Sequence, residues 1–249
     1  MLDGAMRLAR HNQLVIVTPF TLSGAMAPIT LAGALAQQTA ECLAALALLQ
    51  VIRPGAPVAY GSFTSNVDMK TGAPAFGTPE YVRATQISGQ LARRYRLPWR
   101  ASNANAANCP DPQATWESAA SLWACSSARA NIIYHAAGWM EGGLCASFEK
   151  FVIDCEMLQQ LAYYHRPVGV SDEDLAVKAI REVGPTGHFL GSEHTQARYK
   201  TAFYSPFLSD WSNFENWENT GALTAIQRAN RIYKEALQNY EAPPMDSAT

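Results

Sequence analysis

The order of strands and helices constrains this chain more than any other feature of its sequence. Four short apolar runs, rich in β-branched and aromatic residues, are typical of buried strands: residues 14–20 (LVIVTPF), 57–63 (PVAYGSF), 97–102 (LPWRAS) and 131–138 (NIIYHAAG). Each run is followed by a helical pattern, at about residues 30–52, 79–96, 113–128 and 147–164. This repeat predicts a parallel sheet with helical crossovers, and therefore an α/β fold.

A (β/α) barrel of TIM type suits the length of these units, and a doubly wound sheet is the alternative. A closed barrel needs eight strands, but the sequence shows four, or five if the run before His194 contributes. We therefore expect either hidden strands or a partial barrel. Beyond residue 164 the pattern changes to a helix at 171–183, a Gly-rich loop at 184–195, an aromatic segment at 204–217 and a last helix at 223–240.

Composition narrows the classes of partner. The net charge is -2 and only 16% of residues are charged, so we expect no basic surface for nucleic acid or an anionic membrane. The long apolar stretch 31–52 contains Gln37, Gln38 and Glu41, which would be costly in hydrocarbon, so it is expected to pack in a soluble core. With no secretory leader pattern and five cysteines in no zinc-like spacing, we expect a reducing, cytoplasmic location and no metal site.

The carboxyl ends of parallel strands meet at one mouth, and the side chains expected there are mostly aromatic and neutral. They are Thr18, Phe20, Tyr60, Ser62, Trp99, Ser102, Asn103, Tyr134 and His135. Such a lining suits a cationic or apolar small ligand, because aromatic faces attract a quaternary ammonium. The alternative is that these rings merely cap the core.

His135 is the strongest single candidate, because it ends a strand and is followed by the small residues Ala136, Ala137 and Gly138. The alternative is a core histidine that is satisfied by a neighbouring carbonyl. His188 and His194 are six residues apart and do not share a helical face, so we expect no metal pair.

Other chemistries find weaker support. Nucleotide-binding loops of the GxGxxG and GxxxxGK[ST] types, HExxH and GxSxG are all missing. Cys109 and Cys145 are candidate nucleophiles in loops after strands. Glu149 and Glu156 share one face of a helix, and we expect that face to meet solvent rather than the mouth.

Four ordered segments together resemble the trimethylamine methyltransferase superfamily: GAMAPITLAGALAQQTAECLA, VIRPGAPVAYGSF, YHAAGWMEGGLCASFEKFVIDCEM and EVGPTGHFLGSEHT. They extend over about residues 25–195. The resemblance implies a TIM barrel that moves a methyl group from an N-methylated amine to the cobalt of a corrinoid. In this family a separate small protein carries the corrinoid, so the resemblance implies no metal bound by this chain itself.

The sequence departs from the family pattern in two respects. Family members are about twice as long, and this chain resembles their C-terminal half. We therefore expect residues 1–249 to form one C-terminal portion of a barrel that pairs with another chain or a second copy. The founding members carry pyrrolysine near the strand end that here holds Asn103 and Asn105. The chain thus resembles the non-pyrrolysine branch, whose members demethylate quaternary amines such as glycine betaine.

The resemblance also implies roles for residues. His135 and Asn103 would orient the polar end of the substrate, and the rings that would surround the ammonium or shape the pocket are Phe20, Tyr60, Trp99, Tyr134 and Trp139. His188, Glu193 and His194 would contact the corrinoid or its protein, and the enzyme would supply position and a cation-stabilising box more than acid or base. Two rivals stay open: a catalytically silent half-barrel that completes a partner, and a lyase-type barrel with His135 as base, which the lack of a strand-end lysine weakens.

Overall fold

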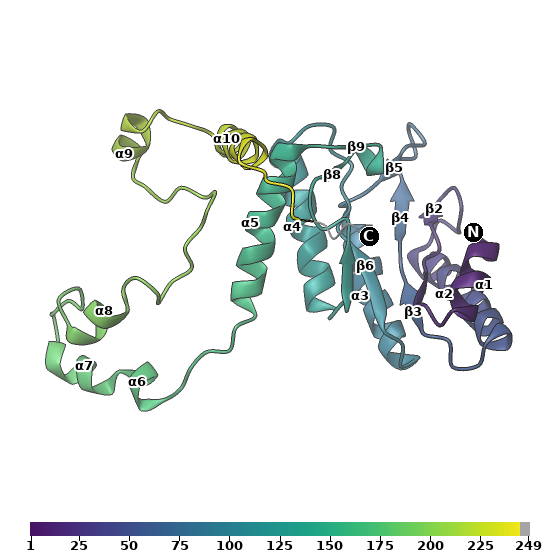
Figure 1. Cartoon of the computed structure of the whole chain (residues 1–249), viewed down its shortest axis with the longest axis horizontal. Coiled ribbons are helices and arrows are strands. Elements are labelled where there is room, and N and C mark those ends of the chain that lie inside the picture. Colours follow the sequence, from purple (N-terminus) through teal and green to yellow (C-terminus); the bar gives the residue numbers. More distant parts are fainter. Residues whose placement is uncertain (245–249) are drawn as a thin grey trace.

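A computed structural model describes residues 1–244, and its centre is a sheet of four parallel strands (Figure 1). The strands are β1 (Val15–Val17), β3 (Val58–Gly61), β6 (Trp99–Ser102) and β7 (Ile132–Tyr134), in the order β1-β3-β6-β7. Each pair is parallel, which confirms the predicted α/β class with helical crossovers. Within residues 1–244, β1 and β7 are the outer strands of this sheet, so a closed barrel stays a prediction.

Four long helices follow the strands where the sequence predicts them: α2 (Leu31–Ile52), α3 (Pro79–Arg94), α4 (Pro112–Ser127) and α5 (Phe148–Tyr164). Local chemistry sets three of their starts. The side chains of Thr78, Asp111 and Ser147 each accept a hydrogen bond from the backbone N–H three residues later. Proline at the first helical position adds to two of these signals.

The main core lies between the sheet and the helices. Tyr60, Trp99 and Ala101 point from the strands into this layer and pack against residues of α2, α3 and α4, including Cys42, Leu46, Ala92 and Cys125. Side chains alternate along a strand, so Ala59 and Arg100 occupy the opposite, inner face of the sheet.

Helix α2 is long and apolar enough to cross a membrane by length and composition alone. Its polar residue Gln38 is nevertheless buried against the protein: it donates to Tyr60 Oη at 2.9 Å and accepts from Thr64 Oγ1 at 2.6 Å. These contacts satisfy both ends of the amide in the interior of the fold.

Two strands bend and continue into a second, smaller sheet. Beyond β1 and β3 the chain forms β2 (Thr21–Ser23) and β4 (Thr64–Val67), which pair in parallel, and β5 (Pro74–Ala75) joins them antiparallel. The sequence predicts single strands over 14–20 and 57–63, but Pro19 has no N–H to donate and the first ladder breaks there. Helix α1 (Leu2–Arg10) and the hairpin β8 (Trp139–Met140) and β9 (Cys145–Ala146), linked by the turn η1 (Glu141–Gly143), are further elements that the sequence pattern does not reveal.

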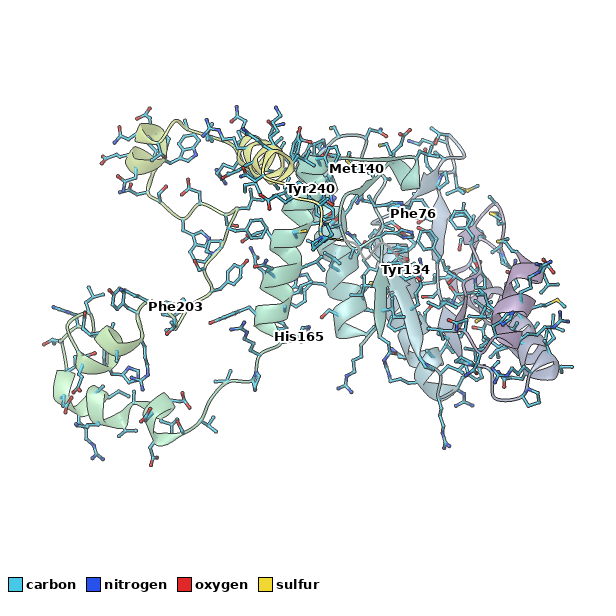
Figure 2. The ribbon with its side chains drawn as sticks, in the orientation of Figure 1. Phe76, Tyr134, Met140, His165, Phe203 and Tyr240 are labelled. Carbon is cyan, nitrogen blue, oxygen red and sulfur yellow. The ribbon has the colours of Figure 1, made fainter. Side chains whose placement is uncertain are left out.

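The C-terminal region follows α5 and extends away from the sheet before its last helix returns to α5. The helix predicted at 171–183 is broken at Ala176, which has a φ of 50°, into α6 (Asp172–Leu175) and α7 (Val177–Val183). Two short helices, α8 (Glu193–Arg198) and α9 (Phe214–Asn219), precede α10 (Ala225–Gln238), which packs on α5 through Ile153, Leu208 and Ala229. Helices α6 to α9 lie away from the sheet, and exposed rings such as Phe203 extend from this region (Figures 1 and 2).

Candidate functional site

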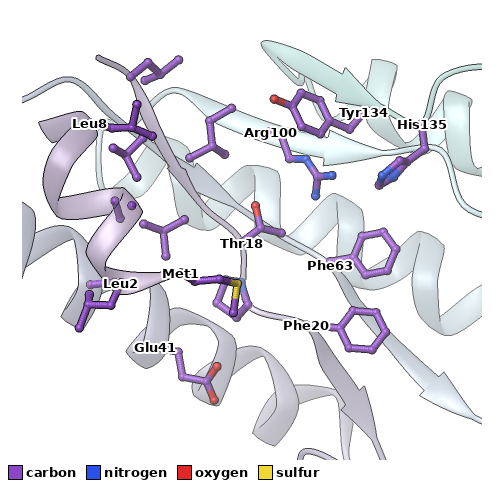
Figure 3. A pocket seen from close by; sticks show the side chains of 18 of the residues that line it. Met1, Leu2, Leu8, Thr18, Phe20, Glu41, Phe63, Arg100, Tyr134 and His135 are labelled. Carbon is purple, nitrogen blue, oxygen red and sulfur yellow. The ribbon is translucent and has the colours of Figure 1, made fainter. Parts of the chain in front are cut away.

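A cavity of about 1200 Å³ lies along β1 and the inner face of the sheet, and it is bounded by α1 and by Glu41 and Ala45 of α2. We call it the inner-face cavity. Residues of α1, of β1 and its continuation, and of the ends of β6 and β7 line it, among them Thr18, Phe20, Phe63, Arg100, Tyr134, His135 and Trp139 (Figure 3). The structure thus brings together five predicted residues, Thr18, Phe20, Tyr134, His135 and Trp139.

Arg100 is the residue that the sequence analysis missed. It stands on β6 and points into the inner-face cavity, although only 5% of it is exposed. Its guanidinium carbon lies 4.4 Å from the ring centroid of Tyr134 and 5.9 Å from that of Phe63. Among residues 1–244, its buried Nε and Nη1 have no hydrogen-bond partner. The expectation of a neutral mouth is therefore wrong, because a buried cation stands in it.

Burial lowers the pKa of Arg100, and Tyr81, Tyr134 and Cys125 act in the opposite direction. An arginine stays protonated in proteins under ordinary conditions because its pKa is so high. Arg100 therefore contributes a positive charge to the cavity.

Gly61 makes room for this arrangement, since it pairs with Arg100 across β3 and β6. A Cβ at Gly61 would lie 2.0 Å from Thr18 Oγ1 and 2.6 Å from Val17 O. Only glycine permits β1 to pass so close at this point.

His135 follows β7 with a φ of 55°, an uncommon conformation for a residue other than glycine. Its ring stacks on Trp139 at 4.9 Å and meets the edge of Phe63 at 6.0 Å. Partial burial lowers the pKa of His135, and the nearby charge of Arg100 lowers it further. The imidazole is therefore neutral at pH 7 and offers one N–H donor and one acceptor.

Aromatic rings form one wall of the inner-face cavity. Phe20 stacks on Phe63 at 5.4 Å, and Trp139 meets Phe63 at 6.0 Å. Phe76 supports them from the core at 5.3 Å from Phe63. Phe20 is 46% exposed and presents its ring to the open space, as a cation-binding wall requires.

Asn103 is fully buried and does not line the inner-face cavity. Its side-chain nitrogen donates to Ser118 Oγ at 3.1 Å and to Ala136 O at 3.2 Å. Asn105 donates to Ser118 and, at 2.7 Å, to Trp139 O. Both asparagines thus hold the loop that carries His135, and the structure gives Asn103 a positioning contact.

A buried ion pair anchors the same loop from below. Lys150 Nζ lies 2.6 Å from Asp154 Oδ2 and 2.6 Å from Ser118 Oγ, and both side chains are fully buried. The other bond of Asp154 Oδ2 comes from the N–H of Gly138 at 2.9 Å. Burial raises the pKa of Asp154 and lowers that of Lys150, and their attraction opposes both effects.

Tyr60 and Trp99 lie in the core between sheet and helices and do not line the inner-face cavity. Tyr60 Oη is bonded to Gln38 and Thr39, and the indole N–H of Trp99 donates to Ser62 Oγ at 3.0 Å. Their polar groups are therefore satisfied within the fold.

The predicted partner-contact residues lie in the C-terminal region, around α8 (Figure 1). His188 and Glu193 are exposed, and His194 Nε2 lies 3.1 Å from Glu173 O. None of the three lines the inner-face cavity, and their contact with a corrinoid or its protein stays a prediction.

The remaining candidates do not form a reactive centre. Both candidate thiols are exposed. Hydrogen bonding to Asp111 raises the pKa of Cys109, and slight desolvation with the neighbouring Glu141 carboxylate raises that of Cys145. Glu156, expected to meet solvent, is instead buried and accepts from the N–H groups of Phe207 and Leu208, each at 3.1 Å. Within residues 1–244, no group of three or more His, Cys, Asp and Glu side chains could hold a metal ion.

Comparison with known proteins finds a matching family profile and several relatives. The family profile described as Trimethylamine methyltransferase (MTTB) matches residues 1–249. A glycine betaine methyltransferase of Desulfitobacterium hafniense is 37% identical over 247 residues, 99% of this chain and 51% of that protein.

Two further relatives are trimethylamine methyltransferases. One from Desulfitobacterium hafniense is 38% identical over 95% of this chain and 48% of its own length. One from Methanosarcina mazei is 34% identical over 97% of this chain and 48% of its own length. The chain therefore spans about half the length of the curated relatives that it matches.

Proposed function

The chain belongs to the trimethylamine methyltransferase family, and on that premise we propose that it binds a quaternary methylamine for methyl transfer to a corrinoid protein. The observation that carries the proposal is the inner-face cavity, in which Phe20, Phe63 and Trp139 form an aromatic wall beside His135. Aromatic faces attract quaternary ammonium groups, and the rings bind them without accepting a proton.

A quaternary substrate needs no acid catalyst. Its nitrogen leaves as a neutral tertiary amine, so no proton has to be delivered. The corrinoid supplies the nucleophile that takes the methyl group. The residues of this chain hold the amine: the rings position the methyl groups, and neutral His135 donates a hydrogen bond to the polar end.

Glycine betaine is the substrate that we propose, for two reasons beyond the aromatic wall. Asn103 and Asn105 occupy the strand end where the resemblance places pyrrolysine in the founding enzymes, and in this structure both anchor the His135 loop. A relative with 37% identity carries the name glycine betaine methyltransferase.

The test is an anaerobic assay in which the chain is mixed with cobalt(I) cobalamin and glycine betaine, tetramethylammonium or trimethylamine. We expect the absorbance to shift to that of methylcobalamin with glycine betaine. Equal turnover of trimethylamine would overturn the choice of substrate, and no methylcobalamin from any amine would overturn the proposed activity.

A second candidate function is a subunit that completes a barrel with another chain. It is favoured by the outer position of β1 and β7 within residues 1–244 and by the open cavity beside β1. Light scattering should then show a complex rather than a soluble monomer of 27.1 kDa. A cooperative melt of a monomer with methyltransferase activity would exclude this candidate.

On the same premise we propose that residues 1–249 act as one portion of a single barrel domain. We also propose a cytoplasmic location, since all five cysteines are free thiols, as in a reducing compartment. A corrinoid protein is the proposed partner.

A further inference from the structure

We propose that Arg100 binds the carboxylate of the substrate, so that the inner-face cavity selects a betaine over a methylamine without an acid group. This inference rests on the proposed function for the identity of the substrate. The geometry of this chain supports the anion site independently of the identity of the substrate.

Arg100 has no counter-charge among residues 1–244. Burying a cation is costly unless it is paired and hydrogen-bonded. The ion pairs described within residues 1–244 are Asp3–Arg7, Lys150–Asp154, Lys178–Glu182 and Glu173–Arg198, and none includes Arg100. Its Nε and Nη1 are buried without an acceptor, and Nη2, which is not among these buried atoms, is the nitrogen that a ligand in the cavity could reach.

The surroundings satisfy Arg100 only in part. The rings of Tyr134 and Phe63 offer cation–π contacts, which leave the N–H groups in the guanidinium plane unbonded. The one carboxylate that lines the cavity, that of Glu41, already accepts from Gln37 Nε2 at 2.8 Å. Arg100 is therefore preorganised for an acceptor that comes from outside these residues.

Arg100 and His135 converge on the same part of the cavity. His135 and Arg100 line the same cavity and both contact Phe63, His135 at 6.0 Å between ring centroids and Arg100 at 5.9 Å. A carboxylate between them would accept from the guanidinium and from the imidazole N–H. The ring of Phe20, on the far side of Phe63, is then free to face the methylammonium end.

The charge of Arg100 affects the selectivity of the cavity between a betaine and a simple ammonium ion. A simple ammonium ion entering this cavity meets the positive charge of Arg100, and like charges repel. A betaine carries its own anion beside the ammonium, so it neutralises Arg100 while it places its methyl groups on the rings. The charge of Arg100 thus favours the zwitterion and disfavours the bare cation.

The test is calorimetric titration of the chain with three probes. Glycine betaine carries both charges. Choline has a hydroxymethyl group in place of the carboxylate, and 3,3-dimethylbutyrate keeps the carboxylate but has a neutral carbon in place of the nitrogen. The variants are Arg100→Met, which removes the charge, and Arg100→Lys, which keeps it. Arg94→Met, at an exposed position of α3, is the matched control.

We expect Arg100→Met to weaken glycine betaine and 3,3-dimethylbutyrate by roughly tenfold to hundredfold, as the loss of charge-assisted hydrogen bonds implies. Choline should bind this variant at least as well as the unaltered chain, and Arg100→Lys should keep part of the affinity for both carboxylates. Arg94→Met should change nothing.

Unchanged affinity of Arg100→Met for glycine betaine would overturn the proposal, and so would a failure of both carboxylates to bind the unaltered chain. If Arg100→Met does not fold, the unaltered chain still decides, because choline must bind it about tenfold more weakly than glycine betaine. Binding of 3,3-dimethylbutyrate through Arg100 without methyl transfer from glycine betaine supports the anion site and removes the proposed function. If glycine betaine is demethylated but Arg100→Met loses no affinity for it, the proposed function stands and the anion site is overturned.

Discussion

Asp154→Asn is the substitution that most sharply tests how the His135 loop is held. It keeps the shape of the side chain but removes the charge that faces Lys150 Nζ at 2.6 Å, in a place where both side chains are fully buried. Breaking a buried pair by removing one partner leaves an uncompensated charge, at a cost of about 3–5 kcal/mol. For a chain of this size, that corresponds to a fall in melting temperature of roughly 6–20 °C.

The assay is thermal and denaturant unfolding, with hydrogen exchange of the segment that contains Gly138. The Gly138 N–H donates to Asp154 Oδ2 at 2.9 Å. An asparagine with its oxygen toward Lys150 turns its NH₂ group toward Gly138 in place of an acceptor, so exchange of this N–H should accelerate. The double variant Lys150→Met with Asp154→Leu replaces both charges by apolar groups and should recover part of the stability, although the Gly138 N–H still lacks its acceptor.

Asp3→Asn is the matched control, because Asp3 and Arg7 form an ion pair of the same spacing on the surface, with side chains that are 77% and 73% exposed. We expect no measurable change there, since solvent screens such pairs. If Asp154→Asn is as stable as the unaltered chain and Gly138 exchanges at the same rate, the ion pair does not anchor the loop and the reasoning fails.

Four further predictions concern the site and its surroundings. His135→Ala should weaken glycine betaine binding roughly tenfold to hundredfold with folding nearly intact, as measured by calorimetry and melting. A drop in melting temperature with unchanged affinity would instead make the histidine structural. The pKa of His135 lies below its ordinary 6.5, so its contribution to stability is present above about pH 6.5 and is lost as the pH falls through the folded-state value. A pH series of melting curves for His135→Gln should therefore be flatter below pH 6.5, and identical curves would contradict the shift. Gly61→Ala should destabilise the chain by about 1–3 kcal/mol, because the new methyl group would overlap Thr18; an unchanged denaturation midpoint would show that β1 can move aside. Tyr60→Phe should cost about 1 kcal/mol of stability through the bonds to Gln38 and Thr39 and leave ligand affinity unchanged. Loss of affinity in that variant would support the role of Tyr60 in the ammonium cage.

The long elements were predictable because their signals are local. Thr78, Asp111 and Ser147 cap α3, α4 and α5, and each of these helices starts within one residue of the sequence prediction. The alternation of apolar runs with helices sufficed for the parallel sheet. The second sheet was not predictable in this way, because the parallel pairing of β2 with β4 depends on contacts far apart in the sequence.

The site was predictable only in part, and the reason is the face of each strand. Position at a strand end brought Phe20, Tyr134 and His135 to the cavity, but it does not tell inner from outer face. In the run Trp99, Arg100, Ala101, the apolar residues alternate with a charged one. That alternation was the available signal that Trp99 faces the helices and Arg100 faces the cavity.

The contacts of Asn103 and Lys150 show a different limit. They meet at Ser118, so three elements separated in sequence build one buried network. No spacing rule links them, because the network exists only once β6, α4 and α5 have packed together. The sequence therefore identified Asn103 as a residue of the site but not its contacts.

The most direct test of the central claim is a crystal structure of the chain with glycine betaine bound. We expect the carboxylate within hydrogen-bond distance, about 3 Å, of the guanidinium of Arg100 and of His135, with the methyl groups against Phe20 and Phe63. A ligand bound outside the inner-face cavity, or one with its ammonium beside Arg100 and its carboxylate toward the rings, would contradict the account.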